Sequence, residues 1–312
     1  MSDFQYGGQA VIEGVMMRGP CGRAVAVRLP EGGIAVDEKT IESVTKKYPF
    51  LKWPLLRGVV ALVESLLIGI EALSYSASQA LGEEEELSKT EMVLTIGFAF
   101  ALAIVLFVVV PTGAAHLLKG YVQGSLAQNL VEGAIRLAVF VLYVYLIGRL
   151  QDIKRVFQYH GAEHKVINAY EAGDHITVES VQRYSTFHPR CGTSFLLIVL
   201  VLSIFLFALL GHQVLWWRIT SRILLLPVLA GISYEALKLS AKYADNFLCR
   251  VLISPGRWLQ GMTTGEPDDS QVEVAISAFG AVLEEQDANR VEAPDSACGS
   301  ALKESEDQGN VR

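Results

Sequence analysis

The clearest chemical signal in the sequence is a group of two histidines and one glutamate within five consecutive positions. His160, Glu163 and His164 follow the order His-x-x-Glu-His. On a helix, positions four apart lie on one face, so both imidazole rings can reach the same ion. In the reversed-order zinc peptidases this pattern holds the metal, and its glutamate is the general base toward a metal-bound water. The pattern is short, and polar residues on a solvated helix face are the alternative interpretation.

A second pair of metal-binding residue types lies further along the chain. His188 and Cys191 end a polar stretch immediately before a long apolar one. A thiolate sulfur and an imidazole nitrogen together suit zinc. The first pair follows one apolar stretch and the second pair precedes the next, so we expect both pairs on the same side of a membrane. A small buried apolar role for Cys191 and a capping role for His188 are the alternatives.

Glu235 is a further candidate ligand, because the reversed-order zinc peptidases take their third ligand from a distant glutamate. It ends the segment Gly231–Glu235, at the predicted cytoplasmic end of the last apolar stretch. A solvated helix end is the alternative. The candidate site thus has Glu163 as its catalytic base, and the candidate ligands of a Zn²⁺ ion are His160, His164, His188, Cys191 and Glu235.

The elements that must position these residues are long apolar stretches. The chain has 312 residues, of which 51% are hydrophobic, and they are concentrated in runs too long for ordinary core helices. The sequence therefore predicts a mostly α-helical, polytopic membrane protein with about four transmembrane helices. The predicted spans are Met92–Leu118, Leu130–Leu150, Ser194–Trp217 and Ile223–Leu237.

Two segments carry charge among apolar residues. Residues 55–81 have a broad apolar face at helical spacing, interrupted by Glu64 and Glu71. Because a carboxylate at the middle of a bilayer is costly, we expect an interfacial or re-entrant helix there, with a true span as the alternative. Glu132 and Arg136, four positions apart in the second predicted span, are expected to pair.

The remaining segments differ in composition. Residues 1–47 predict a small β region, with a hairpin formed by Ala24–Leu29 and Ile34–Val36 and a third strand at Ala10–Met17. From Glu266 onward there are 12 acidic residues against three basic ones, which is typical of a solvated end. The predicted parts are a small cytoplasmic β-rich region (1–47), a membrane domain (48–260) with a cytoplasmic metal-site loop (151–193), a cytoplasmic amphipathic helix (261–286) capped by Asp268 or Asp269, and a disordered acidic tail (287–312).

The distribution of lysine and arginine predicts the orientation. These residues are frequent in the loop 151–193, in the N-terminal segment and after the last predicted span. By the positive-inside rule, both termini and the metal-site loop are expected in the cytoplasm, and the chain in the plasma (inner) membrane.

Several long segments together resemble the YqhQ-like family of bacterial membrane proteins, over roughly residues 4–286. The resemblance implies a metal-dependent enzyme without an assigned substrate, and it supports the histidines, Glu163 and Cys191 as site residues. The segments that carry it are Gly7–Pro20 (GGQAVIEGVMMRGP), Tyr159–Glu171 (YHGAEHKVINAYE), His188–Phe195 (HPRCGTSF), Gly231–Glu235 and Gly261–Ile276.

These observations lead to one principal hypothesis, a cytoplasm-facing, zinc-dependent membrane hydrolase. Its metal needs an open coordination position for water. A shallow site of this kind suits a membrane-embedded peptide or a lipid as substrate.

Two alternatives remain open. In a non-catalytic scaffold or regulator, four ligands close a structural zinc site, and Glu163 only orients one of them. The intramembrane charges favour a transporter, because buried charges often mark a permeation path, and so few spans would then require a homo-oligomer. The sequence contains no nucleic-acid-binding motif.

Overall fold

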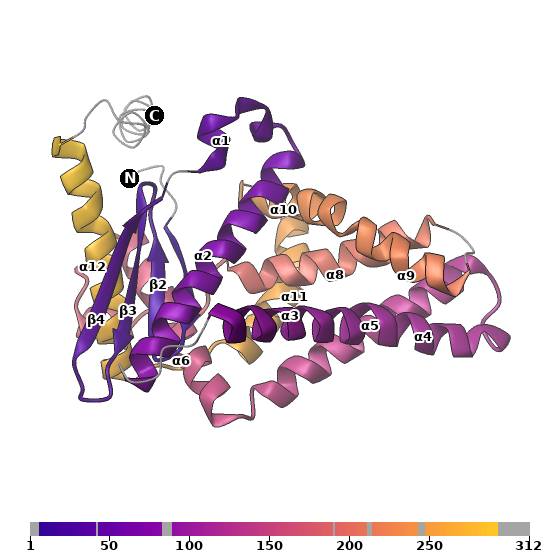
Figure 1. The fold of residues 1–312 in the computed structure, drawn as a ribbon, viewed down its shortest axis with the longest axis horizontal. Helices are drawn as coiled ribbons and strands as arrows, with labels where there is room; N and C mark the ends of the chain where they lie inside the picture. Colours follow the sequence, from indigo (N-terminus) through magenta and orange to yellow (C-terminus); the bar gives the residue numbers. More distant parts are fainter. Residues whose placement is uncertain are drawn as a thin grey trace.

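The computed structural model describes residues 6–41, 43–82, 89–189, 191–210, 214–242 and 247–292. Within them, a four-stranded sheet lies at one end of the molecule, and apolar helices extend from it (Figure 1). The strands are β1 (Gly7–Val11), β2 (Gly14–Arg18), β3 (Gly22–Arg28) and β4 (Ile34–Thr40). The helices are α1 (Val44–Lys47), α2 (Leu56–Leu81), α3 (Lys89–Ile104), α4 (Val110–Leu117), α5 (Ser125–Ile147), α6 (Gln151–Glu171), α7 (Val178–Gln182), α8 (Gly192–Ala208), α9 (Leu215–Leu224), α10 (Leu226–Lys242), α11 (Phe247–Thr263) and α12 (Asp269–Glu292).

The sheet is an antiparallel meander in the order β1-β2-β3-β4. The predicted hairpin is confirmed as β3 and β4. The single strand predicted at Ala10–Met17 is wrong, because the chain turns at Ile12 and Glu13 and Val11 pairs with Gly14. Glu13 adopts a φ of 51°, which few side chains other than glycine, asparagine and aspartate favour, so the turn lacks its usual sequence signal.

Helices cover both faces of the sheet, because its strands bury alternate residues on opposite sides. Val15 and Met17 face α6 and α12, where Phe279 lies in the same apolar core. Met16 faces the other way and packs with Ala72 of α2. Helix α6, which carries the candidate metal ligands, is therefore held against the sheet as part of its core.

Two helical segments are long and apolar enough to cross a membrane, by length and composition: Thr90–Gly120 and Ser125–Ile147. The helices Leu215–Leu224 and Leu226–Leu237 are bent by 46° relative to each other. If this pair forms a single span, it is the third candidate. The described residues thus hold two or three candidate spans, fewer than the four predicted. The predicted span Ser194–Trp217 is divided between α8, which has 17 residues, and α9.

Helix α2 is not among these candidate spans in the described residues. One face packs on the sheet, and the other exposes leucines such as Leu66 and Leu67. Its two carboxylates, Glu64 and Glu71, contact polar groups of other segments and do not lie on the apolar face. Glu64 accepts a hydrogen bond from the Ser43 hydroxyl, and Glu71 lies 3.2 Å from Arg23. An apolar outer face and a charged inner face are typical of an interfacial helix.

The C-terminal helix begins at a capping box. The backbone N–H of Gln271 donates to the Asp268 side chain, and the Gln271 amide oxygen accepts from the Asp268 N–H. Asp268 is therefore the predicted cap. Helix α12 continues to Glu292, so residues 287–292, predicted as tail, are helical. The rest of the predicted tail lies outside the described residues.

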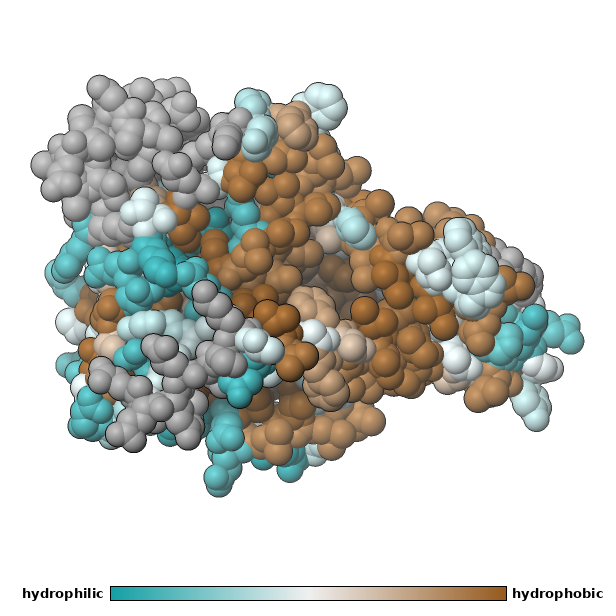
Figure 2. Space-filling model, in the orientation of Figure 1, coloured by the Kyte–Doolittle hydropathy of each residue, from teal (hydrophilic) through white to brown (hydrophobic). Residues whose placement is uncertain are grey.

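Polar and apolar residues separate along the molecule. Figure 2 shows apolar residues over the helical part and polar residues gathered over the sheet end. The metal-ligand candidates on α6 lie where these two parts meet, because α6 follows α5 directly and packs on β1 and β2.

Candidate metal centre

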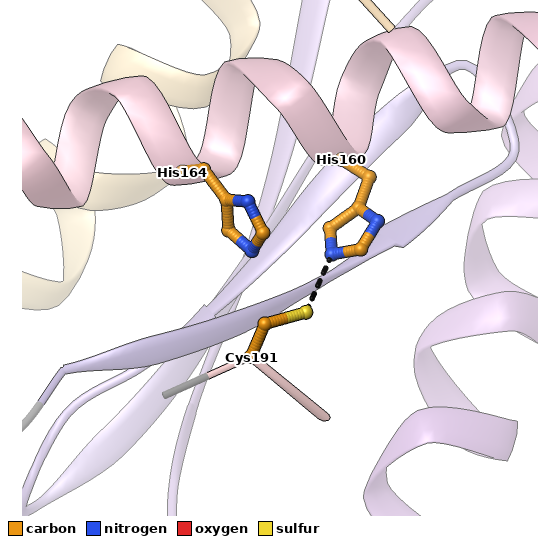
Figure 3. Close-up of side chains that lie close together, drawn as sticks. All are labelled: His160, His164 and Cys191. Atoms are coloured by element: carbon orange, nitrogen blue, oxygen red, sulfur yellow. Dashed lines mark hydrogen bonds between the residues drawn. The ribbon is translucent and has the colours of Figure 1, made fainter. Parts of the chain in front are cut away.

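The structure brings His160, His164 and Cys191 together. One donor atom from each lies within 4.8 Å of the other two. The two histidines are one helical turn apart on α6, and their ring centroids are 4.4 Å apart. Cys191 caps the start of α8, and its Sγ lies 3.3 Å from Nε2 of His160 (Figure 3). Three donors of the types that zinc prefers therefore converge on one point.

Backbone carbonyls orient both imidazole rings. Nδ1 of His160 lies 2.9 Å from the Thr263 carbonyl oxygen, and Nδ1 of His164 lies 2.6 Å from that of Thr186. A carbonyl oxygen only accepts, so each Nδ1 must donate its proton. The neutral ring then leaves Nε2 with a free lone pair, and this is the nitrogen that faces Cys191 in His160. Metal-ligating histidines are typically fixed by such a bond from their other nitrogen.

Burial favours the neutral form of His164 and His188. The His164 side chain is 1% exposed, and desolvation lowers its pKa below the ordinary value for histidine. Desolvation lowers the pKa of His188 in the same way. A neutral imidazole is the form that binds a metal ion, so the lowered pKa of His164 favours metal binding.

Glu163 faces the same point from the helix. Its Oε2 lies 3.9 Å from Nε2 of both His160 and His164, although Glu163 is not part of the three-donor group. The carboxyl is buried, and desolvation raises its pKa. The backbone N–H of Gly8 donates a hydrogen bond to it. A carboxylate at this distance can bind a water molecule held beside the imidazoles and accept its proton.

Gly8 is a site residue that the sequence reasoning did not single out. A Cβ atom there would lie 2.8 Å from Glu163 Cγ and 2.6 Å from the Met16 carbonyl oxygen. Only glycine therefore allows β1 to approach the carboxylate. The available signal was the Gly7-Gly8 pair shortly before the predicted strand Ala10–Met17, because glycine permits close backbone approach.

A cavity adjoins this contact. It has a volume of about 340 Å³ and lies between β1, β2 and α2. Gly8 lines this cavity and also donates its backbone N–H to Glu163. Its further lining includes Gln9, Arg18 and Ser65. The cavity thus adjoins Gly8, whose N–H donates to the buried carboxylate, but Glu163 itself does not line it.

The two other predicted ligands lie outside the three-donor group. The His188 ring is 5.6 Å from that of His164, and its Nε2 lies 3.7 Å from a carboxylate oxygen of Glu171. Glu235 lies on α10, where its carboxylate accepts hydrogen bonds from Nε and Nη2 of Arg57 on α2. The structure therefore places His188 beside the group and commits Glu235 to an ion pair elsewhere.

These features define a class of protein. It is mostly helical, with helices that are apolar enough to cross a membrane, and it has a small N-terminal sheet. A His-His-Cys cluster lies between the helix that packs on this sheet and the start of α8. A family described as "Protein of unknown function (DUF1385)" matches residues 53–285. The protein printed as "Uncharacterized protein YqhQ" of Bacillus subtilis (strain 168) is 38% identical over 292 residues, which are 89% of this chain and 92% of the relative. The chain belongs to this YqhQ-like family, as its motifs predict. No solved structure matches.

Proposed function

We propose that the protein is a zinc-dependent hydrolase at the cytoplasmic surface of the plasma (inner) membrane. The observation that supports it is the convergence of His160, His164 and Cys191 within 4.8 Å, beside the buried Glu163. A zinc ion held there would supply Lewis acidity and lower the pKa of a bound water. Glu163 would accept the proton of that water as it attacks a carbonyl or phosphoryl group.

The number of converging donors favours catalysis over a closed structural site. Three protein ligands leave a fourth position for water, as in catalytic zinc sites. The alternative is a scaffold with four ligands, and one observation favours it. Nε2 of His188 is buried and has no hydrogen-bond partner in the described part of the chain, and its ring lies next to His164. A modest movement of His188 would close the site.

The surroundings support a substrate at the membrane surface. The cavity beside Gly8 is bounded by α2, whose outer face exposes apolar side chains. An interfacial α2 would place this cavity at the lipid headgroups, within reach of a lipid or a membrane-embedded peptide. Our proposal includes α8 as a further, short span, with both termini and residues 151–193 in the cytoplasm.

Removal of both α6 histidines is expected to abolish metal binding. The full chain, purified in detergent without chelator, should contain about one zinc ion. His160→Ala/His164→Ala should contain almost none, because the two imidazole donors are lost together. The matched control is His116→Ala/His175→Ala, which removes two histidines outside the group and should keep the metal. Metal content is measured by mass spectrometry. Wild-type protein without stoichiometric metal would refute the proposal.

Glu163→Gln is expected to keep the metal and lose turnover. Glutamine has nearly the same size but cannot accept a proton, so hydrolysis of a phospholipid or peptide substrate in nanodiscs should fall by about 10²–10⁴-fold. His188→Ala distinguishes the scaffold, because a closed four-ligand site should lose metal and folding together, whereas the three-ligand centre of the hydrolase should keep its metal. If Glu163→Gln retains full activity, or if wild type hydrolyses neither substrate class, the hydrolase is excluded.

A further inference from the structure

One carboxylate in the helical part of the molecule is surrounded by three guanidinium groups. Glu132 of α5 accepts from Nη2 of Arg136, one turn further along the same helix, at 2.7 Å. From α9, Nη2 of Arg218 and Nη2 of Arg222 each lie 2.8 Å from its Oε2. All four residues are buried; Glu132 and Arg222 are each 1% exposed. The predicted pair of Glu132 and Arg136 is therefore confirmed, within a larger cluster.

This cluster has an excess of positive charge. Glu132 is the only aspartate or glutamate in residues 92–151 and 191–234, which include α4, α5, α8 and α9. Arginine stays protonated in proteins, so three guanidinium groups against one carboxylate leave a net charge of +2. Removing charges from water is costly unless they are paired. Two positive charges among these helices therefore lack a counter-charge within the two segments.

The cluster also has hydrogen-bond donors without acceptors. Among the described residues, no acceptor is available to Nε of Arg218 or Nδ2 of Asn129, and both atoms are buried. The Asn129 side chain already accepts from Arg218 and Arg222 through Oδ1, at 3.1 Å each. A buried donor without an acceptor is rare in folded proteins. Missing negative charge and missing acceptors thus occur at the same place.

The surrounding helices hold the guanidinium groups in fixed positions. Pro111 of α4 has no N–H to donate to the carbonyl four residues before it, and that carbonyl, of Phe107, accepts from Nε of Arg136 at 2.9 Å. The guanidinium carbons of Arg136 and Arg222 lie over the Phe207 ring, at 5.1 and 5.0 Å from its centroid. The positive groups are therefore preorganised.

We propose that this arginine cluster (Arg136, Arg218, Arg222, Glu132 and Asn129) binds a phosphate-type oxyanion. A phosphate monoester supplies up to two negative charges and several acceptor oxygens, and guanidinium forks match its geometry. Helices α4, α5 and α9 meet at the end of the molecule opposite the sheet, so the site is separate from the metal centre (Figure 1). Apolar surface gives way to polar residues at this end (Figure 2). A lipid headgroup and free phosphate share the required chemistry.

The experiment measures the midpoint temperature of thermal unfolding of the full chain in detergent, at constant ionic strength. One arm adds inorganic phosphate, with chloride as its reference. The other adds dihexanoyl phosphatidic acid, with dihexanoyl glycerol as its reference. Wild type should be stabilised in a saturable manner by phosphate or by the phosphatidic acid. If both ligands stabilise the protein, free phosphate is sufficient for binding. If only the phosphatidic acid stabilises it, the bound group is a lipid headgroup.

Arg218→Gln should weaken the apparent affinity by at least about tenfold, because it removes one charge and the unpaired Nε donor. The matched control is Arg183→Gln, whose guanidinium is exposed and pairs with Glu179; it should respond like wild type. If Arg218→Gln does not fold, Arg218→Lys tests the site, since it keeps the charge without the Nε donor and should bind more weakly. A wild type that responds to phosphate no more than to chloride, and to the phosphatidic acid no more than to the glycerol, would overturn the proposal. Arg218 variants that bind phosphate or the phosphatidic acid with unchanged affinity would also overturn the proposal. The same holds if the thermal midpoint of unfolding depends on protein concentration and on neither ligand.

Discussion

Replacing Gly161 by alanine is expected to destabilise the protein by about 3 kcal/mol or more and to empty the metal centre. A Cβ atom at this position would lie 2.0 Å from the carbonyl oxygen of Gly265, which is too close for any contact. The two backbones are already joined, because the Gly265 N–H donates to the Phe157 carbonyl at 2.7 Å. Neither partner is a flexible side chain that can move aside, so α6 must separate from residues 263–265.

The loss of metal follows from which groups sit on either side of that contact. The Thr263 carbonyl accepts from Nδ1 of His160, and the Cβ would also approach Cγ2 of Thr186, whose carbonyl orients His164. Displacing α6 therefore disturbs both imidazoles at once. Gly280→Ala is the matched control, since a Cβ there meets open space within α12 and should be neutral or stabilising by about 0.5–1 kcal/mol. Thermal unfolding and metal content are measured together, and a Gly161→Ala protein as stable as wild type would show that the close contact is absent in solution.

Glu132→Gln is expected to be the most destabilising single charge removal in the chain, by about 3–5 kcal/mol. The substitution keeps the volume and one acceptor oxygen but leaves three buried guanidinium groups without any carboxylate. Glu179→Gln is the control, because Glu179 pairs with Arg183 at the surface and its removal should change stability by less than about 1 kcal/mol.

A double variant separates charge from packing at the same place. If charge imbalance causes the loss, Glu132→Gln/Arg222→Gln should recover part of it, because one uncompensated cation is removed with the anion. If the double variant loses more free energy of unfolding than the two single variants lose together, hydrogen bonding and packing dominate instead. Both are measured by thermal unfolding in the same detergent.

The convergence of His160 and His164 could be predicted from sequence, because a helix places positions four apart on one face. Cys191 was predictable as a donor, since it starts the next apolar helix on the same side. Glu235 was not, because the residue that occupies its carboxylate, Arg57, lies 178 positions away. No local sequence pattern predicts an ion pair between residues so far apart in the chain. Gly8 likewise acquires its role only when the sheet docks on α6.

The span count shows a second limit. Apolar length predicted spans at Met92–Leu118 and Leu130–Leu150, and the structure has candidate spans at Thr90–Gly120 and Ser125–Ile147. It failed at Leu225, where the chain bends by 46° inside an apolar run. Arg218 and Arg222 lie between the predicted spans Ser194–Trp217 and Ile223–Leu237, where arginine is expected in a loop. They are four positions apart on α9, and that spacing was the available sign that both face Glu132.

The contacts of the sheet have a consequence for the order in which the protein matures. One face of β2 and β3 is covered by α12, whose Val272 and Phe279 belong to the same core, and His160 is oriented by Thr263. During synthesis the strands emerge first, whereas these partners emerge after every apolar helix between them. The face of the sheet that packs on α12 therefore stays uncovered until Asp269–Glu292 has been synthesised. The carbonyl that orients His160 is likewise synthesised after all three donor residues, so the arrangement of His160, His164 and Cys191 can be completed only once residue 263 has emerged.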